Sequence, residues 1–352
     1  DGPRGRIYQI KQLLEGFEAG PSIQRHLDRC LTCRACETTC PSGVEYHKLL
    51  EIGRGLVEQQ VPRPFLQRLF HRLIIFGFSE SARVRLLLST ARVFRPLLPA
   101  SLKKRIPAAV RVAAAQAGAR GRNMLLLDGC VQPAAAPHIN ALTVQVFDRL
   151  GIQLRTVAES GCCGALQLHL ADSEGAKQRA RANIDAWWPF LEQGAEAIVV
   201  TATGCTPMLK DYQRLLRDDA LYAERAQRVS AMTKDLSEVL SGEDLSTLQT
   251  RDRKRIAFQS PCSLQHAQKL DGAVEALLKQ VGFTLVPVRD AHLCCGSAGT
   301  YSLLQRGLSA QLRRNKLSSL QEKQPELIAT ANIGCLLHLQ VESQVPVIHW
   351  IE

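Results

Sequence analysis

Residues 125–130 read LLLDGC and residues 256–262 read IAFQSPC, so in both stretches a short apolar strand ends at a cysteine. After each of them, two further stretches end in the same way: LRTVAESGCC (154–163) and IVVTATGC (198–205), then LVPVRDAHLCC (285–295) and LIATANIGC (327–335). Helical patterns separate these strands, and such alternation predicts right-handed crossovers and parallel sheets. The sequence therefore predicts an α/β fold over residues 123–352.

The cysteines at these strand ends form one pattern in two copies, and the matching positions differ by 132, 132 and 130 residues. The first copy has Cys130, Cys162, Cys163 and Cys205, and the second copy has Cys262, Cys294, Cys295 and Cys335. Three cysteine positions held in register over this distance indicate an internal duplication. We expect one α/β cysteine-rich domain at residues 123–245 and another at residues 246–352.

The expected elements place these thiols together. Strands are predicted at residues 124–128, 153–157, 197–201, 256–260, 284–288 and 327–331, and helices at about 139–150, 174–192, 264–281 and 301–321. The carboxyl ends of parallel strands meet at one edge of a sheet, where open α/β sheets bind ligands. The alternative is that these cysteines pack as small apolar side chains, but packing alone does not require them to follow strand ends.

A second group of cysteines lies near the start of the chain. Cys30, Cys33, Cys36 and Cys40 form C-x2-C-x2-C-x3-C, and Pro41 follows. This spacing is typical of ferredoxin [4Fe–4S] ligands, where the fourth cysteine binds the other cluster of a pair. We expect a helical ferredoxin-like module at residues 1–60, completed by a sister motif upstream of Asp1, with two [4Fe–4S] clusters in the full-length protein. A zinc site is the alternative.

The positive charge of the chain is concentrated between these parts. The net charge is +11, and residues 61–122 contain thirteen Lys and Arg but one acidic residue, Glu80. Apolar residues at helical spacing, interrupted by prolines, predict short amphipathic helices in this linker. Two interpretations stay open: a solvated basic face packed on the protein, or a surface for an anionic membrane or an acidic partner. No nucleic-acid motif accompanies the charge, so a nucleic-acid partner is not expected.

The composition of the chain also bears on membrane spans and disulfide bonds. No apolar run reaches the length that spans a bilayer. Closely spaced and vicinal cysteines are unsuited to native disulfides, which indicates a reduced, cytoplasmic protein.

Several longer stretches carry a family resemblance. They are DGPRGRIYQIKQLLEG (1–16), HLDRCLTCRACETTCPSGVEYHKLLEIGR (26–54), ARANIDAWWPFLEQGAEAI (180–198), HAQKLDG (266–272), HLCCGSAGTY (292–301) and TANIGC (330–335). They resemble the iron–sulfur subunits of bacterial glycolate oxidase (glycolate dehydrogenase), whose two cysteine-rich CCG domains are of the heterodisulfide reductase type.

The resemblance implies a role in an oxidoreductase complex. FAD-containing partner subunits would oxidise glycolate to glyoxylate, and this chain would relay the electrons towards a membrane quinone from the cytoplasmic face of the inner membrane. It implies cluster ligation by Cys30, Cys33, Cys36 and Cys40, and no catalytic residue for substrate oxidation on this chain. Two alternatives stay open: a subunit of a related lactate or 2-hydroxy-acid dehydrogenase, and a thiol–disulfide oxidoreductase that uses the vicinal cysteines.

The last position of each copy departs from the wider superfamily, which ends each copy in C-x2-C. Met208 follows Cys205 at that spacing, and His338 follows Cys335. Methionine is a poor ligand for iron–sulfur clusters, whereas histidine binds zinc and iron. The expected cofactor-binding residues are therefore the eight cysteines of the two copies and His338. The candidate cofactors are an additional iron–sulfur cluster and zinc, with the second copy favoured if only one is occupied.

Overall fold

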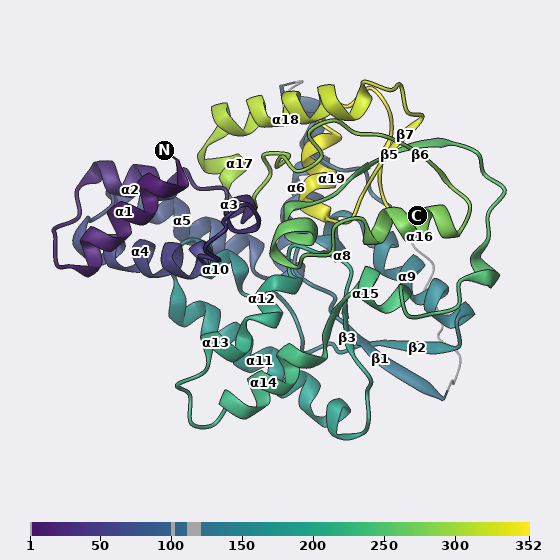
Figure 1. Ribbon diagram of the computed structural model, residues 1–352, viewed down its shortest axis with the longest axis horizontal. Coiled ribbons are helices and arrows are strands. Elements are labelled where there is room, and N and C mark those ends of the chain that lie inside the picture. Colours follow the sequence, from purple (N-terminus) through teal and green to yellow (C-terminus); the bar gives the residue numbers. More distant parts are fainter. Residues whose placement is uncertain (1, 100–102, 111–120) are drawn as a thin grey trace.

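The computed structural model describes residues 2–99, 103–110 and 121–352. A group of N-terminal helices packs beside two α/β units, each built on its own sheet (Figure 1). Both sheets have four parallel strands, in the orders β2-β1-β3-β4 and β6-β5-β7-β8. The same order in both sheets confirms the predicted α/β duplication.

The N-terminal helices are α1 (Pro3–Leu14), α2 (Pro21–Asp28), α3 (Ala35–Thr38) and α4 (Tyr46–Gln60). Helices α1 and α2 both begin at a proline that follows a glycine, a favoured first position because proline lacks the N–H that would stay unpaired there. Ile10, Leu27 and Leu50 form their shared core. Helices α1 and α4 cross closely at Gly53, where an added Cβ would lie 2.7 Å from Ile10 Cγ1.

The linker contains α5 (Phe65–Phe78), α6 (Ser81–Val93) and the short 3-10 helix η1 (Arg95–Leu97). Few side chains of these two helices are buried: His71 and Ile74 in α5, and Val84 in α6. Most of the apolar residues of these helices are exposed instead. In the described part of the chain, no helix is both long and apolar enough to cross a membrane.

The first sheet consists of β1 (Arg122–Leu126), β2 (Ile152–Thr156), β3 (Ile198–Val200) and β4 (Thr233–Asp235). The helices of this copy are α8 (Gln132–Ala135), α9 (His138–Arg149), α10 (Ala165–His169), α11 (Ser173–Glu192), α12 (Thr206–Lys210), α13 (Tyr212–Leu215), α14 (Ala223–Met232) and α15 (Leu236–Leu240). A short 3-10 helix, η2 (Ser246–Leu248), leads to the second copy.

The second sheet consists of β5 (Arg255–Gln259), β6 (Thr284–Val286), β7 (Leu327–Thr330) and β8 (Val347–His349). Its helices are the π-helical turn η3 (Ser263–Ala267), α16 (Ala273–Gln280), α17 (Tyr301–Leu304), α18 (Arg306–Gln321) and α19 (Ile333–Leu339).

The six predicted strands are confirmed to within two residues at their starts, but two predicted helices are wrong as single elements. The helix predicted at 264–281 is split because Gly272 has a positive φ of 78° and starts α16 anew. The helix predicted at 301–321 breaks at Gln305, whose φ and ψ of −119° and 51° are not helical. Strands β4 and β8 were not predicted, because each has three residues and includes polar ones.

The two copies share one hydrophobic core. A single cluster of buried residues takes members from both sheets, among them Phe147 and Val199 of the first copy and Phe258 and Val274 of the second. Two hydrogen bonds join the sheets at their carboxyl edges: Thr203 N donates to Ala331 O (3.2 Å), and His349 Nε2 donates to Thr201 O (3.1 Å). The cysteine-bearing edges of the two copies are therefore held together.

Stability should fall as the pH drops from about 6.5 to 4, partly because of His349. Burial lowers its pKa to about 4, whereas imidazole in an unfolded chain titrates near 6.5. The unfolded state binds more protons in this range, so the free energy of unfolding decreases with pH. We expect His349→Gln to remove up to about 3 kcal/mol of this pH-dependent loss, measured by urea denaturation at several pH values.

The exposed Gln344 offers the control, since Gln344→Asn exchanges one uncharged amide for another and should leave the pH dependence unchanged. If the free energy of unfolding had the same pH dependence in the wild type and in His349→Gln, His349 would not contribute to the loss of stability at low pH.

Candidate metal centres

The cysteine loop (residues 29–41) connects α2 to α4 and contains α3. Thr32 and Arg34 have positive φ angles of 54° and 58°, so the chain turns sharply twice between consecutive cysteines. Such angles are uncommon for residues with a Cβ and cluster at functional sites. These turns alternate with Cys30, Cys33 and Cys36, all three partly buried and free of disulfides.

These three thiols share one electrostatic environment. Burial, together with the charges of Cys294, Cys30 and Cys36, raises the pKa of Cys33 to about 12. Burial also raises the pKa of Cys36, with Cys30 and Glu37 adding to it. A set of thiolates packed in this way needs a compensating positive charge, which a bound metal supplies.

Cys40 has a different environment. The backbone N–H groups of Val44 and Ser42 lower the pKa of its thiol, and that of Gly43 acts in the same direction. It follows α3, whereas the other three cysteines precede or begin that helix. The structure therefore places Cys40 in a turn of amide donors, apart from the shared environment of Cys33 and Cys36.

A partly buried cation adjoins the loop. Arg54 of α4 donates from Nη2 to the carbonyl oxygens of Leu27 (3.0 Å) and Cys30 (3.2 Å). Burial lowers the pKa of Arg54, and the nearby charge of Cys30 opposes that shift. Nothing in the sequence pointed to Arg54, because it is remote from the cysteines along the chain and only the packing of α4 brings it beside the loop.

In the first copy, the four cysteines meet at the sheet edge as expected from the sequence. Cys130 follows β1, Cys162 and Cys163 follow β2, and Cys205 directly precedes α12. Hydrogen bonds from Cys130 and Cys163 lower the pKa of Cys162, while the bond to Cys162 raises the pKa of Cys130. The bonds to Cys162 and Cys205 raise the pKa of Cys163. All four thiols therefore form one connected group.

The second copy repeats this arrangement. Hydrogen bonds from Cys262 and Cys295 lower the pKa of Cys294, and the bond to Cys294 raises the pKa of Cys262. Cys295 Sγ lies 3.3 Å from Cys335 Sγ, at the buried start of α19. The duplication therefore extends from the strands to the interactions of the thiols.

The copies differ in one buried residue beside the thiols. The glycine after each vicinal pair packs on a helix, Gly164 on Ala176 and Gly296 on Ser309. Seven residues further along these helices stand Asn183 and Lys316. Asn183 is neutral, and its Nδ2 donates to Cys162 O (3.0 Å).

Lys316 brings a positive charge into the second copy. It is 2% exposed, and its Nζ donates to Ala291 O (2.8 Å). Burial lowers its pKa, and the charges of Cys295, Cys294, Cys335 and Cys262 act in the opposite direction. The second thiol group therefore has an internal cation in the place where the first has an amide. The sequence offered no sign of this, because Lys316 lies in an ordinary amphipathic stretch.

Met208 and His338 stand where the wider superfamily has the last cysteine of each copy, and the structure shows the surroundings of both. Met208 is buried in the core of the first copy. His338 Nε2 lies 3.3 Å from Ser309 Oγ, and burial lowers the pKa of His338 to about 4, so its imidazole is neutral near pH 7. His338 is thus in a protonation state that could bind a metal, and its Nε2 contacts the hydroxyl and the carbonyl oxygen of Ser309.

The cysteine loop lies against the second copy. Thr38 Oγ1 of α3 is 3.0 Å from His266 Nδ1, and His266 Nε2 donates to His292 O (3.0 Å). Since a carbonyl only accepts, Nε2 carries a proton, and Nδ1 lies within hydrogen-bonding distance of the Thr38 hydroxyl. The thiols of the loop and of the second copy are also close enough to interact electrostatically. The charge of Cys294 contributes to the raised pKa of Cys33, and the charge of Cys33 contributes to the raised pKa of Cys262. In Figure 1, α3 lies at the boundary of the N-terminal helices with the second copy.

The donor set fits iron–sulfur chemistry. Within the described ranges, no group of three or more His, Cys, Asp or Glu side chains is arranged to hold a single metal ion. The three groups of neighbouring side chains described above are all thiols, with no carboxylate among them. Soft thiolate sets of this kind favour iron–sulfur clusters or zinc over hard cations.

Comparison with known families agrees with this geometry. The cysteine-rich domain family CCG matches residues 124–210 and 256–340, one match in each copy. The chain therefore contains two CCG cysteine-rich domains.

Relatives extend the likeness to the whole chain. The "Glycolate oxidase iron-sulfur subunit" of Escherichia coli (strain K12) is 51% identical over 100% of this chain and 87% of its own length. The "Probable glycolate oxidase iron-sulfur subunit" of Bacillus subtilis (strain 168) is 28% identical over 96% of this chain and 82% of its own. This chain belongs to the family of glycolate oxidase iron–sulfur subunits.

More distant likenesses are partial. "Lactate utilization protein A" of Exiguobacterium sp. is 26% identical over 62% of this chain and 88% of its own length. A solved structure of a putative Asp/Glu racemase from Yersinia pestis reaches a TM-score of 0.29 at 11% identity, covering 65% of this chain and 94% of its own. That value is too low to bear on fold or function.

Substituting the glycines near the thiols should destabilise the protein in a defined order. Gly129, Gly164 and Gly296 all have positive φ (81°, 90° and 89°), which costs an alanine about 1–2 kcal/mol. An added Cβ would meet nothing within 4 Å at Gly129, the carbonyl oxygen of Ala176 at 3.2 Å for Gly164, and that of Ser309 at 2.7 Å for Gly296. We expect Gly296→Ala to lose about 1–3 kcal/mol more than Gly129→Ala, with Gly164→Ala between them, measured by chemical denaturation.

Equal losses at the three positions would show that backbone strain alone, and not the contact with the helix, sets the cost.

Proposed function

We propose that this chain is the iron–sulfur electron-transfer subunit of a glycolate oxidase complex. FAD-containing partner subunits oxidise glycolate to glyoxylate, and this chain passes the electrons on towards a membrane quinone. The single observation that carries the proposal is the contact of the cysteine loop with the second copy, since it brings two candidate groups of thiol ligands close together. The names of the Escherichia coli and Bacillus subtilis relatives support it.

The proposed cluster ligands are Cys30, Cys33, Cys36 and Cys40. The first three share one environment and would bind one [4Fe–4S] cluster, whereas Cys40 stands apart and would bind a second. Such clusters accept and release one electron at a time. Arg54 would offset the negative charge of the first cluster from the side of Cys30. We assign residues 1–60 to a ferredoxin-type module, 61–122 to the basic linker, and 123–245 and 246–352 to the two cysteine-rich domains.

The thiols of the two copies are the proposed sites of a further cluster or zinc. The second copy is the favoured one, because Lys316 offsets thiolate charge there and the cysteine loop adjoins it. Its ligands would be Cys262, Cys294, Cys295 and Cys335, with His338 as the candidate from α19. The corresponding set in the first copy is Cys130, Cys162, Cys163 and Cys205.

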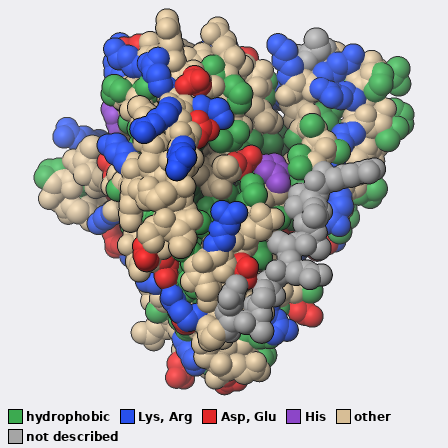
Figure 2. Space-filling model, turned by 90° about the vertical axis from the view of Figure 1, so that its right-hand side faces the viewer, with side chains coloured by type: hydrophobic (Ala, Val, Ile, Leu, Met, Phe, Trp, Pro, Cys, Tyr) green, Lys and Arg blue, Asp and Glu red, His purple; other side chains and the backbone are tan. Residues whose placement is uncertain are grey.

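The linker helices α5 and α6 are the proposed membrane-docking surface, which would place the protein peripherally on the cytoplasmic face of the inner membrane. Their exposed apolar residues are Phe65, Leu66, Leu69, Phe70, Leu73, Phe76, Leu86 and Leu87. Arginines accompany these side chains, and Glu80 is the one acidic residue of the linker. An apolar face edged by cations complements an anionic lipid surface. On the side of the molecule where α6 lies, apolar and basic side chains gather at the upper right of Figure 2.

A lactate dehydrogenase role is the second candidate, and the relatives named for lactate utilisation favour it. They align with about three-fifths of this chain, against the whole of it for the glycolate oxidase subunit of Escherichia coli. The flavoprotein partner would determine which 2-hydroxy acid is oxidised.

The central test is reduction of the clusters by substrate. In the full-length complex, purified anaerobically with its flavoprotein subunits, glycolate should produce the electron paramagnetic resonance signal of reduced [4Fe–4S] clusters. Cys36→Ser should abolish most of the signal of one cluster, because a thiolate ligand is lost. The exposed neighbour Glu45 offers the control, and Glu45→Gln should keep the full signal.

A complex without iron and sulfide, or a Cys36→Ser variant with an unchanged signal, would refute the cluster assignment. Reduction by lactate but not by glycolate would favour the second candidate.

Membrane docking predicts binding to anionic vesicles. The complex should sediment with phosphatidylglycerol vesicles, less with phosphatidylcholine, and less at high salt. Leu66 is 75% exposed on α5, and Leu66→Glu should weaken binding about tenfold or more, because it replaces an inserting apolar group with an anion.

Leu221 is as exposed (80%) but lies in the first copy, so Leu221→Glu is the matched control. Equal effects of the two substitutions would contradict docking through α5.

A further inference from the structure

A cavity of about 90 Å³ lies where four parts of the chain meet. The cysteine loop, α5, the end of α10 and α17 each contribute to its wall, and Cys30 is among the lining residues. This volume is several times what one water molecule requires. The cavity therefore has room for part of an organic ligand beside a proposed cluster ligand.

Neutral hydrogen-bonding groups line this cavity. His71 of α5 is 9% exposed, and its buried Nε2 has no hydrogen-bond partner. An unpaired buried polar atom is costly unless a ligand or water satisfies it. His169 at the end of α10 and Tyr301 of α17 also line the cavity. Burial lowers the pKa of both His71 and His169, so both imidazoles are neutral near pH 7.

The cations of the lining are already engaged. Arg63 donates to both carboxylate oxygens of Asp28 (2.7 and 3.0 Å) and to Glu58 (2.7 Å). Arg54 donates to the backbone carbonyl oxygens of Leu27, in α2, and of Cys30, in the cysteine loop. The groups left for a ligand are therefore neutral: imidazoles, hydroxyls and the side-chain amides of Gln67 and Gln305. These suit a neutral molecule with carbonyl acceptors better than a free anion.

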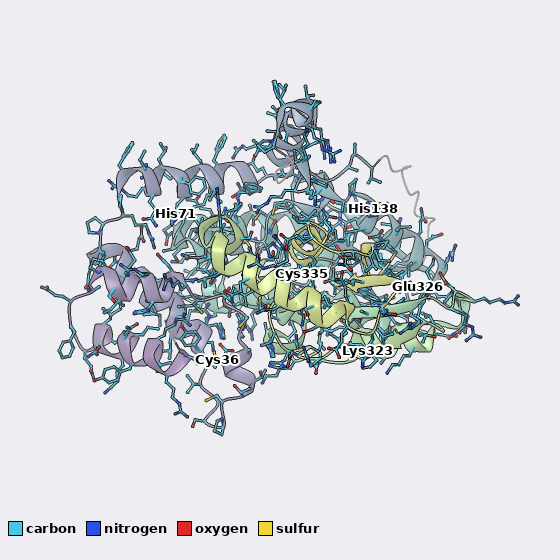
Figure 3. The ribbon with its side chains drawn as sticks, turned by 90° about the horizontal axis from the view of Figure 1, so that it is seen from above. Cys36, His71, His138, Lys323, Glu326 and Cys335 are labelled. Atoms are coloured by element: carbon cyan, nitrogen blue, oxygen red, sulfur yellow. The ribbon has the colours of Figure 1, made fainter. Side chains whose placement is uncertain are left out.

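The position of the cavity favours a ligand that arrives from a lipid surface. His71 lies on the buried face of α5, opposite the apolar residues of the membrane-docking surface. Figure 3 shows α5 at the edge of the molecule, with His71 labelled beside it and other side chains of the helix pointing away from the body. One helix thus connects the apolar surface with the cavity wall.

We propose that this cavity binds the head group of a membrane quinone, with His71 and Tyr301 as hydrogen-bonding partners of its carbonyl oxygens. The inference rests on the proposed function, which supplies the electrons. Glycolate releases two electrons and two protons as it becomes glyoxylate. The cluster bound by Cys30 delivers the electrons singly, and the quinone takes up two electrons and two protons from water to become the quinol.

The test uses the full-length complex with decylubiquinone as acceptor and a photoreactive azidoquinone as probe. The azidoquinone should label peptides of α5 or α17. His71→Leu removes a donor and Leu304→Trp fills the cavity, and each should raise the KM for decylubiquinone at least tenfold and reduce the labelling. His71→Gln, which can still donate a hydrogen bond, should lie closer to the wild type.

His138 is the matched control, since it lines a separate cavity with Leu336 and lies apart from His71 in Figure 3. His138→Leu should leave the KM unchanged. Reduction of a soluble dye by glycolate, which reports on the flavoprotein, should be the same in all variants.

Labelling confined to other peptides, or wild-type KM values in both His71→Leu and Leu304→Trp, would overturn the inference. Labelling is measured without glycolate, so it is independent of the electron donor. Labelling at α5 in a complex whose clusters glycolate does not reduce would uphold the quinone site and refute the proposed donor.

Discussion

The meeting of parallel strand ends at one sheet edge is the constraint on which the rest of the structure depends. Three strands of each copy deliver their thiols to this edge, although the cysteines are tens of residues apart. The two edges then face each other, joined by backbone and His349 hydrogen bonds. The cysteine loop packs against the second of them, so the fold concentrates its thiols near one internal boundary.

The two copies match more closely in their strand order and thiol contacts than in the charges beside their thiols. Both copies repeat the strand order and the hydrogen bonds between thiols. They differ where Asn183 in one copy corresponds to Lys316 in the other, and the second copy hydrogen-bonds to α3 through His266. A buried cation favours negative charge in its surroundings. The two thiol groups therefore have different electrostatic surroundings, even though their cysteines follow the same pattern.

The sequence alone predicted those features that a short stretch of residues reveals. Cysteine spacing marked both kinds of thiol group, and apolar runs that end at cysteines marked six strands. It missed β4 and β8, whose three-residue strands carry too few apolar side chains to stand out. It also missed Arg54, His71 and Lys316, because their importance comes from helices that pack beside the thiols. Tertiary contacts of this kind leave no periodic trace in one sequence.

The common core of the two copies has a consequence for how the protein folds. Residues of both sheets fill one cluster, so removing either copy would expose apolar surface of the other to water. The two copies are thereby coupled in folding. A chain cut between them would leave this shared cluster open to water in both halves, so each copy depends on the other for part of its stability.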